Sequence, residues 1–77
     1  KAVPTLYSAG VWKITMYAGD HNPPHFHIVT RDRMEAQVAI ATLAVLKGEV
    51  RANVLKAALA WAAKNRALLE QTWTEMH

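Results

Sequence analysis

Three short segments of this chain alternate between apolar and polar side chains, and this alternation restricts the chain to folds built on a sheet. Residues 11–17, 25–30 and 34–40 place apolar side chains at every second position, the period expected of a strand with one buried face. The apolar rows are Trp12, Ile14 and Met16; Phe26 and Ile28; and Met34, Ala36, Val38 and Ile40. Three such strands with one shared apolar face predict an antiparallel meander, with residues 43–46 as a candidate fourth strand.

The register of this sheet follows from keeping its apolar face unbroken, because a slip of one residue would turn every side chain to the other face. A three-residue loop over residues 31–33 satisfies this condition, whereas a two-residue loop would mix the faces. The expected cross-strand pairs are His27 with Gln37, Val29 with Glu35, Thr15 with His27, and Tyr17 with His25.

From Arg51 onward the chain is rich in Ala, Leu and Lys and contains neither Gly nor Pro, a composition that favours helix. Apolar residues recur there at three- and four-residue steps and predict one stripe that covers the sheet. The stripe comprises Leu55, Leu59, Ala62, Leu69, Trp73 and Met76, widened by Val54, Ala58, Trp61 and Leu68. A straight helix over residues 51–76 would be roughly 39 Å long, which overhangs a small domain, so we expect a break near Asn65.

These patterns together predict an α+β fold, a three- to four-stranded antiparallel meander covered on one face by a C-terminal helix or helix pair. The 77 residues suit a single domain over residues 1–77, with the strand meander at about 6–46 and the helical part at about 51–76.

The chain has no cysteine, which excludes disulfides and thiolate metal sites and suits the cytoplasm. No apolar run approaches the roughly 20 residues of a membrane span, so we expect no membrane association.

The charge balance is modestly basic. Nine Lys and Arg against six Asp and Glu give a net charge of +3, which would favour RNA, DNA or an acidic protein as a partner. The basic residues are scattered singly or in pairs, a distribution equally typical of a solubilising surface.

Residues 19–27 read Gly-Asp-His-Asn-Pro-Pro-His-Phe-His and hold three of the four histidines and one carboxylate. His25 and His27 are two positions apart on a predicted strand, so both imidazoles point to the face opposite the apolar row. Asp20 and His21 lie on the loop that enters this strand, and the Pro-Pro step stiffens that loop. If the chain performs chemistry, we expect it at this histidine cluster.

One interpretation of the cluster is a metal site. Neutral imidazole and carboxylate groups bind zinc and other divalent transition metals. His25 and His27, with His21 or Asp20 as the third ligand, would form a site with an open fourth position. The spacing His-x-x-x-His-x-His fits this interpretation.

A second interpretation is metal-independent acid–base catalysis. His25 and His27 would act as general base and general acid in RNA cleavage, and Lys13 or Arg31 would stabilise the charge of the transition state. A third interpretation is structural: Asp20 and the following loop residues would form turn hydrogen bonds, and partly buried histidines would hold the loop to the sheet.

The C-terminal end of the chain offers a different kind of site. If the last helix extends past the sheet, Trp73 and Met76 become exposed apolar surface, which predicts a partner site or a homo-oligomer contact. His77 is expected to be disordered and to have no role.

The nonapeptide of residues 19–27 is preceded by Ile-x-Met-Tyr and followed by Leu-x-Trp-Ala and Leu-Leu-Glu-x-x-Trp. In these features the chain resembles the small bacterial domain-of-unknown-function family numbered 4160, from Pro4 to about Trp73. Some members carry the label of the toxin half, DhiT, of a toxin–antitoxin pair. The resemblance implies a cognate antitoxin-like protein as partner and a growth-inhibiting activity. Its site residues by position are Asp20, His21, His25 and His27.

The chain departs from the family pattern at residues 31–33, where Arg-Asp-Arg stands in place of an expected Gly-containing turn. We predict the toxin-like component of a toxin–antitoxin pair that acts on RNA through the histidine cluster, as a metal-independent ribonuclease. The alternatives are a metal-binding module, with zinc or another divalent transition metal, and a non-catalytic protein-interaction or regulatory domain.

Overall fold

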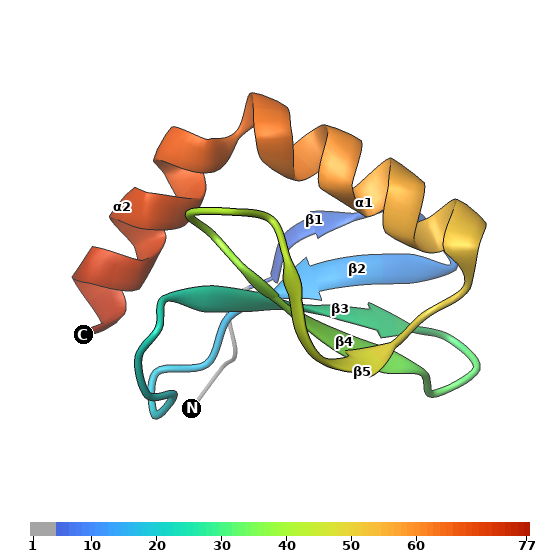
Figure 1. The fold of residues 1–77 in the computed structure, drawn as a ribbon, viewed down its shortest axis with the longest axis horizontal. Coiled ribbons are helices and arrows are strands. Elements are labelled where there is room, and N and C mark those ends of the chain that lie inside the picture. The colour runs from blue at the N-terminus through green and yellow to red at the C-terminus, as the bar shows by residue number, and fades with distance from the viewer. Residues whose placement is uncertain (1–4) are drawn as a thin grey trace.

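Five antiparallel strands lie in the sheet in the same order as in the chain, and two helices cover one side of it (Figure 1). The computed structural model describes residues 5–77. Its elements are β1 (Thr5–Ser8), β2 (Trp12–Thr15), β3 (His25–Thr30), β4 (Glu35–Ala39), β5 (Val45–Glu49), α1 (Ala52–Lys64) and α2 (Arg66–Met76). The predicted α+β class, the meander and the helix pair are confirmed. Residues 1–4 of the predicted domain, with Pro4 at the start of the resemblance, lie outside the described residues.

The prediction of three or four strands is wrong, because the sheet has five. β1 is a four-residue edge strand in which only Leu6 is partly buried, so its alternation is too short to recognise. β5 is the other edge strand and is exposed along its whole length. It contains Lys47 and Gly48 and extends to Glu49, past the predicted end of the fourth strand at residue 46. A glycine within a strand is typical of a close backbone approach or a bulge.

The predicted register is confirmed at three positions: Thr15 pairs with His27, His27 with Gln37, and Val29 with Glu35. The prediction for Tyr17 is wrong, because β2 ends at Thr15 and leaves Tyr17 outside the ladder. The loop between β3 and β4 has three residues, as predicted, and is closed by the backbone N–H of Thr30, which donates to the Met34 carbonyl at 2.9 Å.

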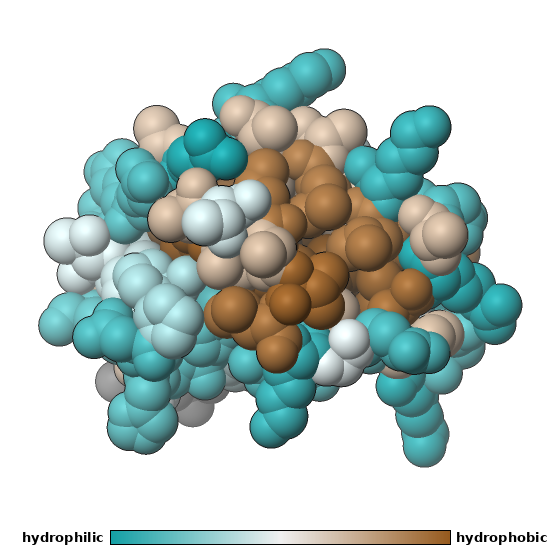
Figure 2. Space-filling view, viewed as in Figure 1, coloured by the Kyte–Doolittle hydropathy of each residue, from teal (hydrophilic) through white to brown (hydrophobic). Residues whose placement is uncertain are grey.

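The hydrophobic core lies between the helices and the predicted apolar face of the sheet. Seven residues of the predicted apolar rows are at most 1% exposed: Ile14, Met16, Phe26, Ile28, Ala36, Val38 and Ile40. The helices add Val54, Ala58, Ala62, Leu69 and Trp73. Figure 2 shows further apolar side chains gathered on the surface of the face turned to the viewer, and Val45 and Leu46 of β5 are among the exposed large apolar residues.

The helical segment breaks at Asn65, as predicted. A straight helix over this segment would exceed the longest dimension of the molecule, 29 Å. The side-chain amide of Asn65 donates to the carbonyl of Trp61 at 2.9 Å, and Nε of Arg66 donates to the carbonyl of Ile40 at 3.2 Å. These bonds hold the bend, and α2 runs down toward the start of β3 (Figure 1). Within residues 5–77, neither helix has the length and apolarity to cross a membrane.

Candidate functional site

β3 places both strand histidines on the face of the sheet that the helices leave uncovered. His25 and His27 alternate with the core residues Phe26 and Ile28, so the predicted common direction of the two imidazoles is confirmed. Their rings lie 5.2 Å apart between centroids. Both residues are nevertheless buried, with exposed fractions of 6% and 5%. The loop before β3 and the end of α2 supply part of this cover.

The carboxylate of Asp20 lies between the two imidazoles. Its Oδ2 atom is 2.8 Å from Nε2 of His27 and 3.1 Å from Nε2 of His25. These contacts show that the loop of residues 16–24, which contains a cis peptide bond between Asn22 and Pro23, folds back over the strand and brings Asp20 to the histidines. His21 does not join this group and is exposed. The sequence left both residues open as the third ligand, and the structure brings Asp20 into position.

Each imidazole is also held by its second nitrogen. Nδ1 of His25 lies 2.8 Å from the carbonyl oxygen of Pro23, and Nδ1 of His27 lies 2.5 Å from Oε2 of Glu35. A carbonyl or carboxylate oxygen can only accept a hydrogen bond, so each Nδ1 carries the proton. In the neutral form of both rings, the Nε2 lone pairs then face the same carboxylate oxygen.

Three electron-rich atoms therefore converge at one point: Nε2 of His25, Nε2 of His27 and Oδ2 of Asp20. Such an arrangement requires positive charge between them, supplied either by protons on the imidazoles or by a metal cation. One ligand atom from each residue lies within 4.8 Å of the others. In a tetrahedral zinc site with bonds of about 2.0–2.2 Å, ligand atoms are about 3.3 Å apart. The observed separations from Asp20 are a few tenths of an ångström shorter, so a small outward movement would admit a cation.

Aromatic and hydroxyl side chains surround the cluster. The ring of Tyr17 meets His27 edge-on, with centroids 4.5 Å apart, and Trp73 packs beside His25 at 5.5 Å. Thr15, the cross-strand neighbour of His27, is 2% exposed, and its hydroxyl has no hydrogen-bond partner among the described residues. The cluster is thus shielded from water on several sides, which strengthens electrostatic interactions within it.

A family model described as a domain of unknown function, DUF4160, matches residues 12–74. The chain belongs to the DUF4160 family. The matched residues run from the start of β2 into α2 and include the whole histidine cluster, and the predicted family resemblance is confirmed. No curated protein and no solved structure matches this DUF4160 chain.

The sequence patterns did not identify two residues that contact the histidine cluster or its loop, Glu35 and His77. Glu35 is a diagonal neighbour of His27 in the predicted register, a signal that brings the two residues close without indicating the hydrogen bond between them. The prediction that His77 is disordered is wrong: its ring stacks on Trp73 at 3.7 Å, and its Nε2 lies 3.0 Å from the backbone oxygen of Asp20. Trp73 is 8% exposed and Met76 is partly buried, so these side chains do not form the exposed apolar surface that would follow if the last helix extended past the sheet.

Proposed function

We propose that Asp20, His25 and His27 form a centre for a divalent transition metal, with zinc as the first candidate. The observation that carries this proposal is the convergence of two imidazole Nε2 atoms on one carboxylate oxygen, with both Nδ1 atoms held by acceptors. Metal-binding histidines commonly donate their second N–H to a carboxylate or a backbone carbonyl, which fixes the tautomer and orients the ring. Glu35 and the carbonyl of Pro23 supply these two partners here.

Three protein ligands leave a fourth coordination position, the arrangement of hydrolytic rather than structural zinc sites. A metal in such a position acidifies a bound water molecule enough to supply hydroxide near neutral pH. The centre therefore suits hydrolysis of a polar substrate, in which the metal would also polarise the bond that is attacked.

The metal-independent ribonuclease that the sequence suggested fits the geometry less well. General acid–base catalysis by a histidine pair needs two nitrogens directed at different atoms of the substrate. In this site Nε2 of His25 and Nε2 of His27 face one carboxylate, and both side chains are at least nine-tenths buried. The metal interpretation accounts for these contacts, because both Nε2 atoms and the Asp20 carboxylate would bind the same cation.

For the role in the cell, we propose the toxin-like component of a toxin–antitoxin pair that acts on RNA in the cytoplasm and is held by a small antitoxin-like protein. The sequence resemblance and the net charge of +3 support this role. A non-catalytic protein-interaction or regulatory domain is the alternative. Burial of Trp73 argues against a homo-oligomer contact through its ring.

The metal proposal predicts that metal-free protein binds one zinc ion, as measured by isothermal titration calorimetry. His27→Gln and Asp20→Asn should each weaken binding by at least about tenfold, because each removes one of three ligands. Glu35→Gln should weaken it by about 10- to 100-fold through loss of the partner of His27.

His21→Ala is the matched control, since it removes an exposed imidazole from the same loop and should leave binding unchanged. Thermal melting of each variant by circular dichroism separates loss of a ligand from loss of the fold. Absence of binding by the wild-type protein, or equal binding by the folded Asp20→Asn variant, would contradict the proposal.

A further inference from the structure

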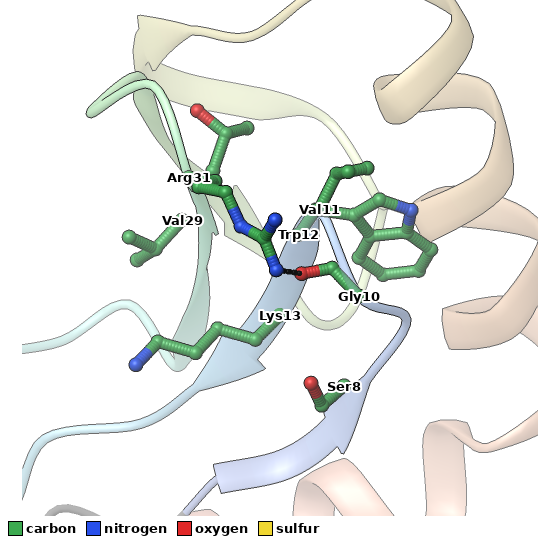
Figure 3. Close-up of a pocket in the computed structure, with 8 residues that line it drawn as sticks. Ser8, Gly10, Val11, Trp12, Lys13, Val29 and Arg31 are labelled. Carbon is green, nitrogen blue, oxygen red and sulfur yellow. Dashed lines mark hydrogen bonds between the residues drawn. The ribbon is translucent and has the colours of Figure 1, made fainter.

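A groove of about 270 Å³ lies at the other end of the strands that carry the histidine cluster (Figure 3). Its lining includes Ser8 at the end of β1, Lys13 of β2, and Val29 and Arg31 at the end of β3. Along β3 the groove residues Val29 and Arg31 continue the row of alternate residues that begins with His25 and His27. Val29 and its cross-strand partner Lys13 therefore place the groove on the face of the sheet that carries the cluster, with His27 and Val29 about 7 Å apart along β3.

The groove is cationic. Lys13 and Arg31 are the charged residues of its lining, and no Asp or Glu belongs to it. Among the described residues neither cation takes part in an ion pair, whereas the nearby acids are engaged elsewhere: Glu35 with His27, and Asp32 with Arg51. No carboxylate of the described residues therefore pairs directly with Lys13 or Arg31.

Arg31 is held in place while it keeps donors free. One guanidinium nitrogen donates to the carbonyl of Gly10 at 3.3 Å, a contact drawn in Figure 3. The remaining N–H groups can form a paired contact with a phosphate, for which the planar fork of arginine is suited, and lysine adds a point charge. The volume is below the roughly 300–1,000 Å³ of small-molecule pockets, so the groove fits one group of an extended ligand.

We propose that this groove binds a phosphodiester group in the backbone of single-stranded nucleic acid, and that the strand continues along the same face toward the histidine cluster. Lys13 and Arg31 would be the positioning cations of the ligand. The second half of this inference rests on the proposed function, because it makes the bound strand the substrate of the centre formed by Asp20, His25 and His27. The first half depends only on the groove.

Fluorescence anisotropy with a labelled single-stranded oligoribonucleotide tests the groove. The double variant Lys13→Gln/Arg31→Gln should bind at least tenfold more weakly than the wild type. The slope of log affinity against log salt should be less steep by about 1.4, as expected for the loss of two phosphate contacts with a single strand. The control Lys56→Gln/Lys64→Gln removes the same charge from exposed positions of α1 and should change affinity by less than threefold.

Three results would overturn the inference: equal weakening by both double variants, no binding by the wild type, or competition by polyglutamate as effective as unlabelled RNA. An oligodeoxynucleotide of the same sequence identifies the source of the phosphate. Equal affinity for the DNA and RNA oligonucleotides means that the protein contacts the phosphate backbone alone. Tighter binding of RNA means that the 2′-hydroxyl adds to the affinity.

The folded double variant His25→Gln/His27→Gln distinguishes this inference from the metal proposal. It should lose zinc binding and still bind the oligonucleotide more tightly than the variant Lys13→Gln/Arg31→Gln, because it keeps both cations of the groove. If zinc binding fails in every protein and strand binding depends on Lys13 and Arg31, the groove stands without the metal centre. If zinc binds and the groove variant binds RNA normally, the groove assignment is wrong while the centre stands.

Discussion

Gly48 occupies a position in β5 that no other residue can adopt without strain. Its backbone has a φ of +74°, and a Cβ atom added there would overlap the carbonyl oxygen of Glu35 on the neighbouring strand. The other two glycines provide a graded comparison. Gly10 has a φ of +86° but open space around it, and Gly19 has open space without a left-handed φ.

Alanine at these three positions should therefore separate strain from steric overlap. Gly19→Ala should change the free energy of unfolding by less than about 0.5 kcal/mol. Gly10→Ala should lower it by about 1–2 kcal/mol, the cost of a left-handed L-residue. Gly48→Ala should lower it by more than Gly10→Ala, because the strand must also move away from Glu35. Urea denaturation measures all three, and an equal loss at Gly10 and Gly48 would show that the overlap is relieved without cost.

A second feature at residue scale is the acid Asp32. The hydroxyl of Thr30 donates to its carboxylate, and Arg51, immediately before α1, binds it at 2.9 Å. These two hydrogen bonds hold the pKa of Asp32 below its ordinary value. The carboxylate thus links the β3–β4 loop to the start of α1.

At the scale of elements, the β3–β4 hairpin explains how this chain can lack the glycine expected in its turn. Three-residue hairpin loops commonly end in a residue with left-handed φ, which is usually glycine. Arg33 takes this position with a φ of +70°. The loop length predicted from the sequence is correct, and the turn tolerates arginine because the surrounding ladder enforces its conformation.

The hairpin geometry predicts that Arg33→Gly stabilises the domain by about 0.5–1 kcal/mol, since relief of left-handed strain exceeds the added entropy of the unfolded chain. Arg31→Gly is the matched control in the same loop. It should be destabilising, because Arg31 does not have a positive φ and donates to the Gly10 carbonyl. Denaturation midpoints of the two variants that shift in the same direction would refute this explanation of the turn.

At the scale of the whole molecule, both helices cover one face of the sheet, so the opposite face carries the histidine cluster and the cationic groove. The C-terminal end of α2 reaches around to this second face: Trp73 packs beside His25, and His77 contacts the backbone of Asp20. The loop that supplies the third site residue is thereby held by a residue 57 positions away in the chain.

The proposed role in the cell is a property of the whole molecule and predicts its effect on growth. Expression of the wild-type chain without its antitoxin-like partner should inhibit growth and degrade cellular RNA, and coexpression of that partner should restore growth. The variant His25→Gln/His27→Gln should be harmless, and His21→Ala should stay toxic. A wild-type chain without effect on viability or RNA integrity would remove the toxin role but leave the calorimetric test of the metal centre intact.

Local patterns in the sequence were sufficient for the strands β2 to β4, their register, the composition of the helices and the break at Asn65. Alternation and helical spacing depend only on neighbouring residues, and a two-residue step along β3 suffices to place His25 and His27 on one face. Edge strand β1 escaped, and β5 was predicted only in part, at residues 43–46, because the exposed residues of the edge strands carry no such alternation.

Only the tertiary structure decided the composition of the site. The sequence offers Asp20 and His21 equally as the third ligand, and the path of the loop, set by packing against β3 and α2, brings in the carboxylate and leaves the imidazole outside. The burial of both histidines, the contact of Glu35 with His27 and the common groove lined by Lys13 and Arg31 likewise depend on contacts between distant segments. Such contacts arise from the packing of the folded chain as a whole, and no local pattern of residues encodes them.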